Sequence, residues 1–408
     1  MTLDELYREI RNERKAKLAL VVLDGVGDIA TSDQGNQTPL EAAKTPNLDA
    51  LVREGCAQGR IIPVAPGVTP GSGPGHLALF GYDPLQYQVG RGVIEVLGLG
   101  LDLQPGDVAA RCNFCTIDEN GTVTDRRAGR IPTEECQRLC QILSEKIQKI
   151  DDVELIIRPG KEHRFVVIFR GPGLGAPLTD TDPGSEGLSI QEAKPTDPNN
   201  AGQQKLARII AEFYKQALPL LKNELKANAF LMRGIAEKPD IPLFEDRYGL
   251  KAACLAVYPM YKGLAQLVGM TKIEGPETID QQFRKYQEIY DQYDFFFIHF
   301  KYTDKYGEDG NFQAKVKAIE EFDAALPILL EKKPDVLVIT GDHSTPCAVK
   351  GHSWHPVPVL LQSKYSGVDL LDRFTEKTAI SGSLGLFEAK YLMPIMMANA
   401  KLFDKFGA

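Results

Sequence analysis

The chain has 408 residues, of which 43% are hydrophobic and 25% charged, and its formal net charge is −8 at pH 7. This composition is typical of an ordinary folded protein, long enough for a large core and more than one domain. Nucleic acid is disfavoured as the main partner, because binding its phosphate backbone requires concentrated positive charge and no Lys/Arg block dominates the sequence.

No membrane partner is expected. The longest apolar runs, such as 18–23 and 295–300, are far shorter than the ~20 residues of a membrane-spanning helix. The N-terminal stretch is charged throughout and lacks the apolar region of a secretory signal. Seven cysteines, an odd number, are typical of a reducing compartment. We therefore predict a cytoplasmic protein.

The first part of the chain alternates a strand with a helix. An apolar strand at 18–23 ends at Asp24, and a helix follows from Pro46, which suits a first turn, to Gly55, which suits a helix end. The region 61–75 is rich in Gly and Pro and predicts strand and loop.

The middle of the chain has a different pattern of predicted elements, with short strands and turns around two helices. Strands at 108–118 and 122–129 are separated by the turn signal Glu119-Asn120-Gly121. A helix near 133–149, strands at 154–160 and 164–170, and a helix near 200–225 follow. This pattern predicts an α+β module inserted at 105–227, after which the chain returns to the first sheet near Phe230.

Two close cysteine pairs, Cys112-x2-Cys115 and Cys136-x3-Cys140, allow a zinc site to be considered. An offset of three in a strand, however, places Cys112 and Cys115 on opposite faces. Buried free thiols are therefore the favoured interpretation.

The last part repeats the alternation of the first. A helix at 277–292, a strand at 294–300, a polar loop at 301–311, a helix at 314–332 and a strand at 335–340 follow one another. Apolar strands alternating with helices predict an α/β fold with a mostly parallel sheet covered by helices on both faces. The domain that contains this sheet is expected to comprise residues 1–104 and 228–408 and to carry the catalytic, metal-binding site.

Three aspartates share one position, directly after a predicted buried strand. They are Asp24, Asp304 and Asp342. In an open parallel sheet the ligand site lies outside the carboxyl ends of the strands, so these three carboxylates are expected to meet at one cation site. His343 and His352 lie in the same loop as Asp342. This mixture of oxygen and imidazole ligands suits Mn²⁺, Zn²⁺ or similar ions better than calcium.

Ser72 is the candidate nucleophile. It is flanked by glycines in a loop that leads into a predicted helix, where the backbone can approach a phosphate and the helix N-terminus favours its charge. A serine hydroxyl requires a base or a metal for activation, and no Ser-His-Asp arrangement is evident in the local sequence. His76, on the same helix, is expected to support the site rather than to bind metal.

Several long motifs are similar to those of one family. The sequence contains VVLDGVGD, KTPNLDAL, VTPGSGPGHLALFGYDP, ARCNF, DRRAGRI, FLMRGIAEKPDIPLFEDRYGLKA, KGLAQLVGM, DFFFIHFKYTD, TGDHSTPC and HSWHPVPVL. Over nearly its whole length it resembles the archaeal-type branch of the 2,3-bisphosphoglycerate-independent phosphoglycerate mutases, in the alkaline phosphatase superfamily. The resemblance implies an isomerase of glycolysis and gluconeogenesis that interconverts 2-phosphoglycerate and 3-phosphoglycerate.

The resemblance also implies roles for individual residues. Ser72 would become phosphoserine, two divalent ions would be bound, with Mn²⁺ expected first and Mg²⁺, Zn²⁺ or Co²⁺ as alternatives, and the inserted module would close over the substrate. One metal site would comprise Asp24, Ser72, Asp342 and His343, and the second Asp304 and His352. The substrate would be bound by Arg126, Arg127, Arg130, Arg233 and Lys262.

One position departs from the family pattern. Relatives commonly have a histidine four residues after the second-site aspartate, where this chain has Glu308. We expect Glu308 to be a metal ligand, with His355 as another source of an imidazole. Two alternatives stay open: a phosphatase or mutase acting on another small phosphorylated metabolite, and a binding protein with a degenerate second metal site. Nothing in the sequence indicates an oligomeric state.

Overall fold

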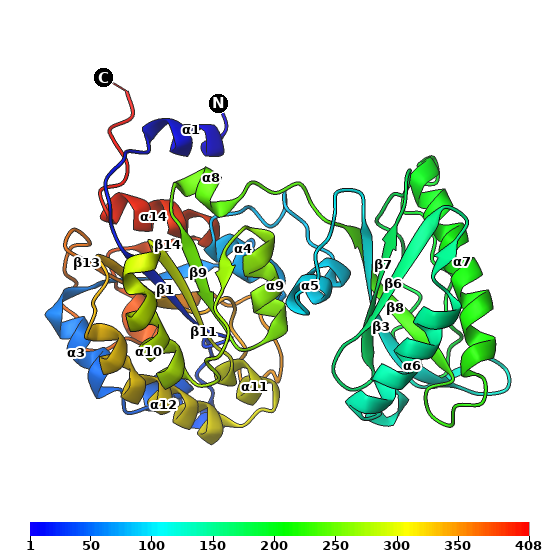
Figure 1. The fold of residues 1–408 in the computed structure, drawn as a ribbon. Coiled ribbons are helices and arrows are strands. Elements are labelled where there is room, and N and C mark those ends of the chain that lie inside the picture. The colour runs from blue at the N-terminus through cyan, green and yellow to red at the C-terminus, as the bar shows by residue number, and fades with distance from the viewer. Residues whose placement is uncertain (408) are drawn as a thin grey trace. The chain divides into compact units, whose positions relative to one another are not determined.

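The computed structural model describes residues 1–407, which form two compact units. The larger unit combines residues 1–88 with the chain from Ile241 onward, and the smaller unit is Val89–Asp240. Each unit has its own sheet (Figure 1). Among the described residues, no helix is both long and apolar enough to cross a membrane.

The sheet of the larger unit is mostly parallel. Its strands run in the order β10-β9-β11-β1-β12-β13-β2-β14, and five of the seven pairings are parallel, β13 being antiparallel to both neighbours. The central strands β1, β11 and β12 are buried at every residue, which explains their unbroken apolar sequences. The strands are β1 (Leu18–Leu23), β2 (Ala57–Ile62), β9 (Ala252–Leu255), β10 (Thr271–Lys272), β11 (Phe295–Phe300), β12 (Val336–Thr340), β13 (Val357–Ser363) and β14 (Gly385–Glu388).

Helices cover both faces of this sheet, which confirms the predicted α/β fold class. One layer contains α2, α3, α10, α11 and α12, and the other contains α4, α9 and α14 (Figure 1). The helices of the larger unit are α1 (Leu3–Ile10), α2 (Pro39–Ala42), α3 (Pro46–Gly55), α4 (Ser72–Leu79), α8 (Phe244–Tyr248), α9 (Pro259–Leu267), α10 (Ile279–Ile289), α11 (Tyr302–Glu308), α12 (Phe312–Leu330), α13 (Glu376–Ile380) and α14 (Leu392–Asn399), with 3-10 turns at Ser32–Gln34, Tyr290–Gln292 and Ala389–Tyr391.

The segment after β11 differs from its prediction. The polar stretch 301–311 was expected to be a loop, because it has no apolar periodicity, but Tyr302–Glu308 forms the helix α11. The helix is short and held by its surroundings: the Thr303 hydroxyl donates a hydrogen bond to the backbone oxygen of Asp24. The Asn311 side chain then caps α12 by accepting from the amide of Ala314. The consequence is that Asp304 and Glu308 lie one helical turn apart.

The smaller unit is an antiparallel α+β structure. Its strands β4 (Val123–Asp125), β3 (Val108–Ile117), β7 (Arg164–Arg170), β6 (Val153–Pro159) and β5 (Lys149–Ile150) are adjacent in that order, and β8 (Ala229–Glu237) pairs with β3. Helices α6 (Thr133–Lys146) and α7 (Ala201–Leu221) share a core with one face of the sheet, α5 (Arg91–Gly98) packs on β3, β7 and β8, and a 3-10 turn lies at Ala128–Arg130. Cys112 lies in this core and Cys115 in a separate cluster, on opposite faces of β3 as predicted.

The boundaries of the smaller unit differ from the predicted 105–227. On the N-terminal side α5 belongs to it, because Gly92 brings this helix so close to β3 that a Cβ would lie 2.4 Å from the backbone oxygen of Ala109. On the C-terminal side the chain does not return to the large sheet at Phe230, since this residue lies in β8 and pairs with Phe114 of β3. β8 begins with four buried apolar residues, as the central strands of the large sheet do, so its sequence did not reveal its partner.

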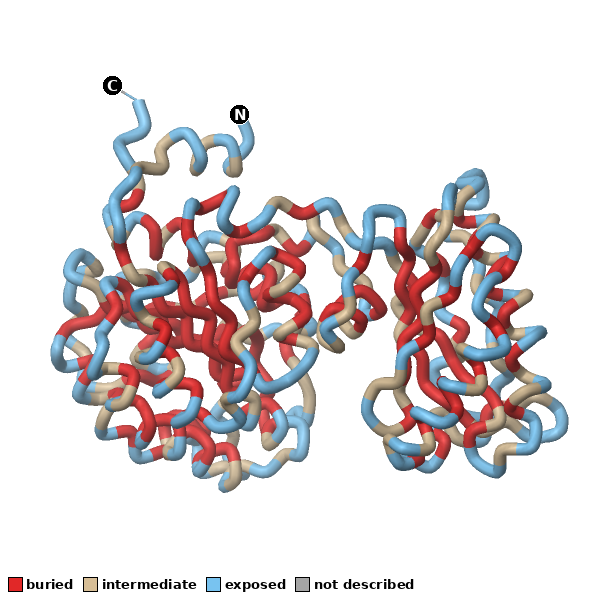
Figure 2. Tube along the Cα trace, in the orientation of Figure 1, coloured by how far each residue is buried: buried red, intermediate tan, exposed pale blue. Residues whose placement is uncertain are grey.

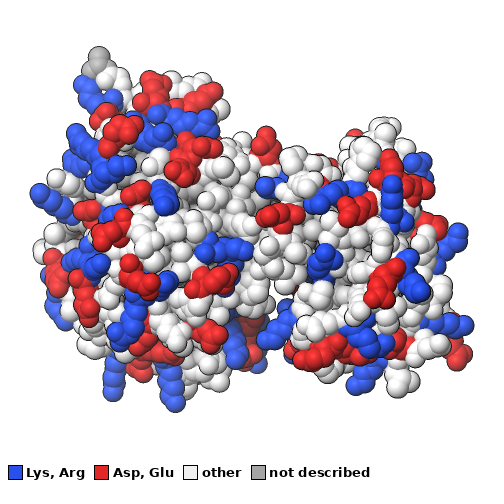
Figure 3. Space-filling view, viewed as in Figure 1, with Lys and Arg blue, Asp and Glu red and all other residues white. Residues whose placement is uncertain are grey.

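Buried residues concentrate in the strands of each sheet (Figure 2). On the face shown in Figure 3, lysines and arginines are interspersed with aspartates and glutamates, without an extended area of one sign.

Candidate active site

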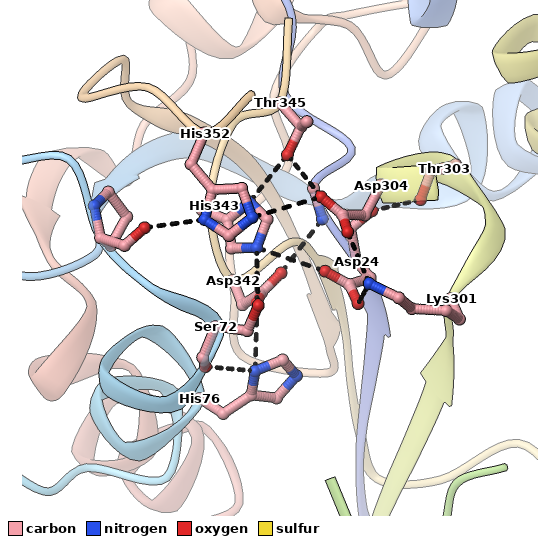
Figure 4. A network of polar contacts seen from close by, with 12 residues as sticks. Asp24, Ser72, His76, Lys301, Thr303, Asp304, Asp342, His343, Thr345 and His352 are labelled. Atoms are coloured by element: carbon pink, nitrogen blue, oxygen red, sulfur yellow. Dashed lines mark hydrogen bonds and ion pairs between the residues drawn. The ribbon is translucent and has the colours of Figure 1, made fainter. Parts of the chain in front are cut away.

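The parallel register of three strands brings the three predicted aspartates together. In the sheet β1 lies between β11 and β12 and is parallel to both. Asp24 follows β1 directly, Asp342 follows β12 after one glycine, and Asp304 lies in the first turn of α11 after β11. Figure 4 shows their side chains converging with two histidines and a serine. The strand-end rule therefore predicted this cluster correctly.

Two overlapping ligand groups form this cluster. The first comprises Asp24, Asp342 and His343, and the second Asp304, His343 and His352, with the ligand atoms of each group within 4.8 Å of one another. His343 Nε2 lies 3.3 Å from Asp24 Oδ1 and 3.2 Å from Asp342 Oδ2. Its membership of both groups was not predicted, since the resemblance implied a role for it in one site only.

The histidine tautomers suit metal binding. The Thr345 hydroxyl donates its single proton to Asp304 Oδ1 at 2.8 Å, so at 2.9 Å it accepts a proton from His343 Nδ1. His352 Nδ1 likewise donates to the backbone oxygen of Pro70 at 2.9 Å. In the neutral form, both rings therefore present the Nε2 lone pair to the carboxylates, which is the arrangement of metal-ligating histidines.

Two buried carboxylate oxygens also fit a cation. Asp24 and Asp342 are fully buried. Among the described residues, imidazole nitrogens are the ion-pair partners of the two oxygens: Asp24 Oδ1 lies 3.3 Å from His343 Nε2, and Asp342 Oδ2 lies 3.2 Å from His343 Nε2 and 3.1 Å from His76 Nδ1. Burying an anionic oxygen is costly unless a cation faces it, and with a neutral His343 a divalent ion between these oxygens and the Nε2 lone pair offsets that cost. The first group thus fits one ion. In the second group, Asp304 Oδ1 and His352 Nε2 lie 3.5 Å apart, which suits a second ion that does not need His343.

Glu308 lies beside the second group rather than in it. Its Oε1 is 4.0 Å from His352 Nε2, and its side chain is 56% exposed. Helix α11 places it one turn after Asp304, on the same side of the helix. A metal-binding role for Glu308 stays a prediction. His355 forms a hydrogen bond with Ser353 Oγ instead.

Ser72 is the first residue of α4, with Gly71 as N-cap, and its Oγ lies 3.2 Å from His343 Nε2. One turn later, His76 Nδ1 lies 2.8 Å from the backbone oxygen of Ser72 and 3.1 Å from Asp342 Oδ2. His76 therefore supports the site, as predicted, and does not belong to either ligand group. Gly75 allows this close approach, because a Cβ there would lie 2.4 Å from the Asp342 backbone oxygen.

The carboxylates and the basic groups stabilise each other's charged forms. Burial alone would raise the pKa of Asp24, but hydrogen bonds from His299 and His343 and the charge of Lys301 hold it well below its usual value. Burial alone would lower the pKa of His343, but the charges of Asp342 and Asp24 raise it to about 9. In the protein without metal, this cluster is thus a set of mutually stabilised charges.

Several contributors carry no local sequence signal. Lys301 forms ion pairs with Asp24 and Asp304, and the Tyr261 hydroxyl donates to Asp24 Oδ2. The fully buried Lys315 donates to the backbone oxygens of Gly25, Gly27 and Thr345 and to the Asp28 carboxylate, connecting the loops that carry Asp24 and His343. Apart from Asp304, which lies three residues after Lys301, their partners lie far away in sequence, so no spacing or periodicity could indicate these contacts.

A second polar site lies within the smaller unit. It is a pocket of about 370 Å³ that is lined mainly by arginines. Four of the five predicted substrate-binding residues line it, namely Arg126, Arg127, Arg130 and Arg233, with Arg91, Arg111, Asn113, Glu162, His163 and Arg164. The fifth, Lys262, lies in the other unit on α9 and pairs with Glu274 at 2.6 Å.

The charge of this arginine pocket is only partly compensated. Arg126 forms two hydrogen bonds with Asp182, and Arg233 lies 3.6 Å from the same carboxylate. Arg91, Arg127, Arg130 and Arg164 have no ion-pair partner among the described residues. Burial and the neighbouring arginines lower the pKa of His163 to about 4, so this ring is neutral at pH 7. Such a pocket is suited to carboxylate and phosphate groups.

An α/β sheet that presents two candidate metal-ligand groups and a serine at a helix N-terminus has the features of a metal-dependent phosphoryl-transfer enzyme. The family model described as 2,3-bisphosphoglycerate-independent phosphoglycerate mutase matches residues 54–226. The chain is 49% identical, over 99% of its length and 100% of the relative, to a probable enzyme of that name from Aquifex aeolicus, and 50% identical to one from Thermotoga maritima, with 99% of both chains covered. The chain therefore belongs to the family of 2,3-bisphosphoglycerate-independent phosphoglycerate mutases.

Solved structures agree with this assignment. A Pyrococcus horikoshii protein matches with a TM-score of 0.82 and 32% identity, over 97% of this chain and 100% of that one. The cofactor-independent phosphoglycerate mutase from Thermoplasma acidophilum matches with a TM-score of 0.73 and 32% identity, over 95% of this chain and 100% of that one.

Proposed function

We propose that this protein interconverts 2-phosphoglycerate and 3-phosphoglycerate without 2,3-bisphosphoglycerate, through a phosphoserine at Ser72. The observation that carries the proposal is the position of Ser72 Oγ at the N-terminus of α4, 3.2 Å from Nε2 of His343, a residue that belongs to both candidate ligand groups. The free, buried state of all seven cysteines supports a cytoplasmic location.

Two divalent ions fit the site. Asp24, Asp342, His343 and Ser72 would hold the first, and Asp304 and His352, with Glu308 as a further ligand, the second. Mn²⁺ suits this mixture of carboxylates and imidazoles, with Mg²⁺, Zn²⁺ and Co²⁺ as alternatives. When bound, such ions lower the pKa of a coordinated hydroxyl and stabilise charge on phosphoryl oxygens.

The protein's own residues determine the course of the reaction. Ser72 Oγ loses its proton and attacks the phosphorus in line. The serine O–P bond forms, the bond between phosphorus and the glycerate oxygen breaks, and that oxygen takes up one proton, so that no net proton is gained or lost. The amides at the start of α4 face the phosphoryl oxygens. In the return step, the other glycerate hydroxyl loses its proton and attacks the phosphoserine, which frees Ser72.

The arginine pocket is proposed to bind the carboxylate and phosphate of the substrate. Arg126, Arg127, Arg130 and Arg233 were predicted for this role, and we add Arg91, Arg111 and Arg164. Lys262 is kept as a phosphate ligand in the larger unit, provided that it leaves Glu274. Because water would otherwise capture the phosphoryl group, glycerate must stay sheltered between the two steps, a role that we assign to the inserted unit.

The direct test is interconversion of the two phosphoglycerates, followed by NMR without added bisphosphoglycerate, together with release of inorganic phosphate. We expect isomerisation to be much faster than release, to stop after chelation and to return with Mn²⁺. Release that exceeds isomerisation would identify a phosphatase, and isomerisation that is indifferent to chelators would contradict the metal-dependent mechanism.

Metal binding should depend on pH through His343. In the protein without metal, its pKa lies near 9 instead of the usual 6.5, so the charged ring stabilises the fold below pH 6.5, and this contribution disappears as pH rises through 9. A metal must displace that proton. We expect the apparent Mn²⁺ affinity of the metal-free protein to rise by up to about tenfold per pH unit between pH 7 and 9. Titration calorimetry in buffers of different ionisation enthalpy measures both quantities, and a pH-independent affinity without proton release would refute this.

A further inference from the structure

Lys301 connects the two ligand groups. Its Nζ lies 2.9 Å from Asp24 Oδ2 and 2.5 Å from Asp304 Oδ2, and donates to the Tyr261 hydroxyl at 3.3 Å (Figure 4). It stands at the N-terminus of α11, and its side chain is 29% exposed. One ammonium group therefore contacts a carboxylate from each ligand group.

The two oxygens of each carboxylate face different partners. Asp24 Oδ2 and Asp304 Oδ2 face Lys301, whereas Asp24 Oδ1 lies 3.3 Å from His343 Nε2 and Asp304 Oδ1 lies 3.5 Å from His352 Nε2. The Oδ1 atoms are therefore the ones beside the imidazole lone pairs, and the Oδ2 atoms are already paired with a cation. The Oδ1 atoms of both side chains are thus left free of the lysine contact.

Charge balance explains why a lysine is needed here. Asp24, Asp304 and Asp342 place three buried or nearly buried carboxylates at one edge of the sheet. Their mutual repulsion is unfavourable at low dielectric, and an ammonium group between two of them reduces it. The Tyr261 hydroxyl supports this arrangement, because it donates to the Asp24 oxygen that Lys301 contacts and accepts from Lys301.

We propose that Lys301 supplies a permanent third cation of this centre: it remains on Asp24 Oδ2 and Asp304 Oδ2 when divalent ions occupy the Oδ1 side. As a positioning residue it holds both carboxylates in one rotamer and prevents either of them from turning both oxygens toward a metal. The inference rests on the proposed two-metal function only for the loaded protein. For the metal-free protein it rests on the ion pairs alone.

The test compares Lys301→Ala and Lys301→Met with Lys305→Ala, an exposed lysine one turn further along α11 that has no carboxylate partner among the described residues. Without metal, both Lys301 variants should melt about 2–5 °C lower than wild type. Ethylammonium ion should restore the melting temperature of Lys301→Ala and leave wild type and Lys305→Ala unchanged. With saturating Mn²⁺, kcat should fall about 10- to 100-fold with little change in KM.

The outcomes separate this inference from the proposed function. Wild-type protein that binds no metal and isomerises nothing would end the proposed function, while the melting and ethylammonium results would still test the ion pairs. If saturation with Mn²⁺ removes the stability difference between wild type and the Lys301 variants, the metals displace Lys301 and the permanent cation is refuted. Unchanged melting of both metal-free variants would refute the ion pairs themselves.

Discussion

Replacement of Ser72 by alanine is expected to abolish the interconversion of 2- and 3-phosphoglycerate, with a loss of at least about 10⁴-fold in kcat. Without the hydroxyl oxygen no phosphoserine can form, and no other nucleophile lies at the start of α4. The fold should be unaffected, because the partners of the hydroxyl, His343 and Tyr261, both keep their contacts with the Asp24 carboxylate.

The matched control for this variant is Thr69→Ala. Thr69 is an exposed hydroxyl residue in the same loop and lies three residues before Ser72. It should retain wild-type activity, and both variants should melt within about a degree of the parent. Mass spectrometry of wild type quenched during turnover should show one phosphoryl group on the peptide that contains Ser72. Residual isomerisation by Ser72→Ala would refute the phosphoserine mechanism.

The sequence predicted the ligand cluster because a simple geometric rule connects it to the strands. Buried parallel strands have unbroken apolar sequences, and the side chains that follow them meet at one edge of the sheet. Asp24, Asp304 and Asp342 could be placed together on this basis alone. His343 could be placed there too, because it directly follows Asp342 in the sequence.

Residues that support the cluster could not be predicted in this way. Lys301 was assigned to a polar loop, and Lys315 to a helix, where lysine side chains are usually exposed. Lys301 is half-buried by its ion pair with the distant Asp24 as well as with the nearby Asp304, and Lys315 is buried by its hydrogen bonds to backbone oxygens of a distant segment. Only the assembled fold contains this information.

The predicted boundaries of the inserted unit differ from those of the structure for another reason. Composition indicated where short strands and turns begin, but α5 and β8 resemble elements of the larger unit in sequence. Their place is determined by pairing of β8 with β3 and by packing of α5 over both strands. Arg91 and Arg111 lie on α5 and β3, so these two members of the arginine pocket could not be associated with the DRRAGR motif.

The arginine pocket leads to the second large expected effect. The double variant Arg127→Gln/Arg164→Gln removes two arginines without an ion-pair partner among the described residues, so no carboxylate is left unpaired by the change. A charge-assisted hydrogen bond contributes about 1.5–3 kcal/mol, so two lost contacts to substrate should lower kcat/KM by about 10² to 10⁴-fold. Arg208→Gln, an exposed arginine on α7 of the same unit, is the control and should be nearly silent.

The division of this loss between kcat and KM shows what the pocket does. If the arginines bind substrate equally in the ground state and the transition state, the double variant should have a raised KM and an unchanged kcat. If they also retain glycerate between the two transfers, kcat falls and inorganic phosphate appears, because water then takes the phosphoryl group from Ser72. We expect the second pattern, since a mutase must keep an intermediate that a phosphatase releases. Wild-type kcat/KM in the double variant, with its melting temperature preserved, would show that the substrate binds elsewhere.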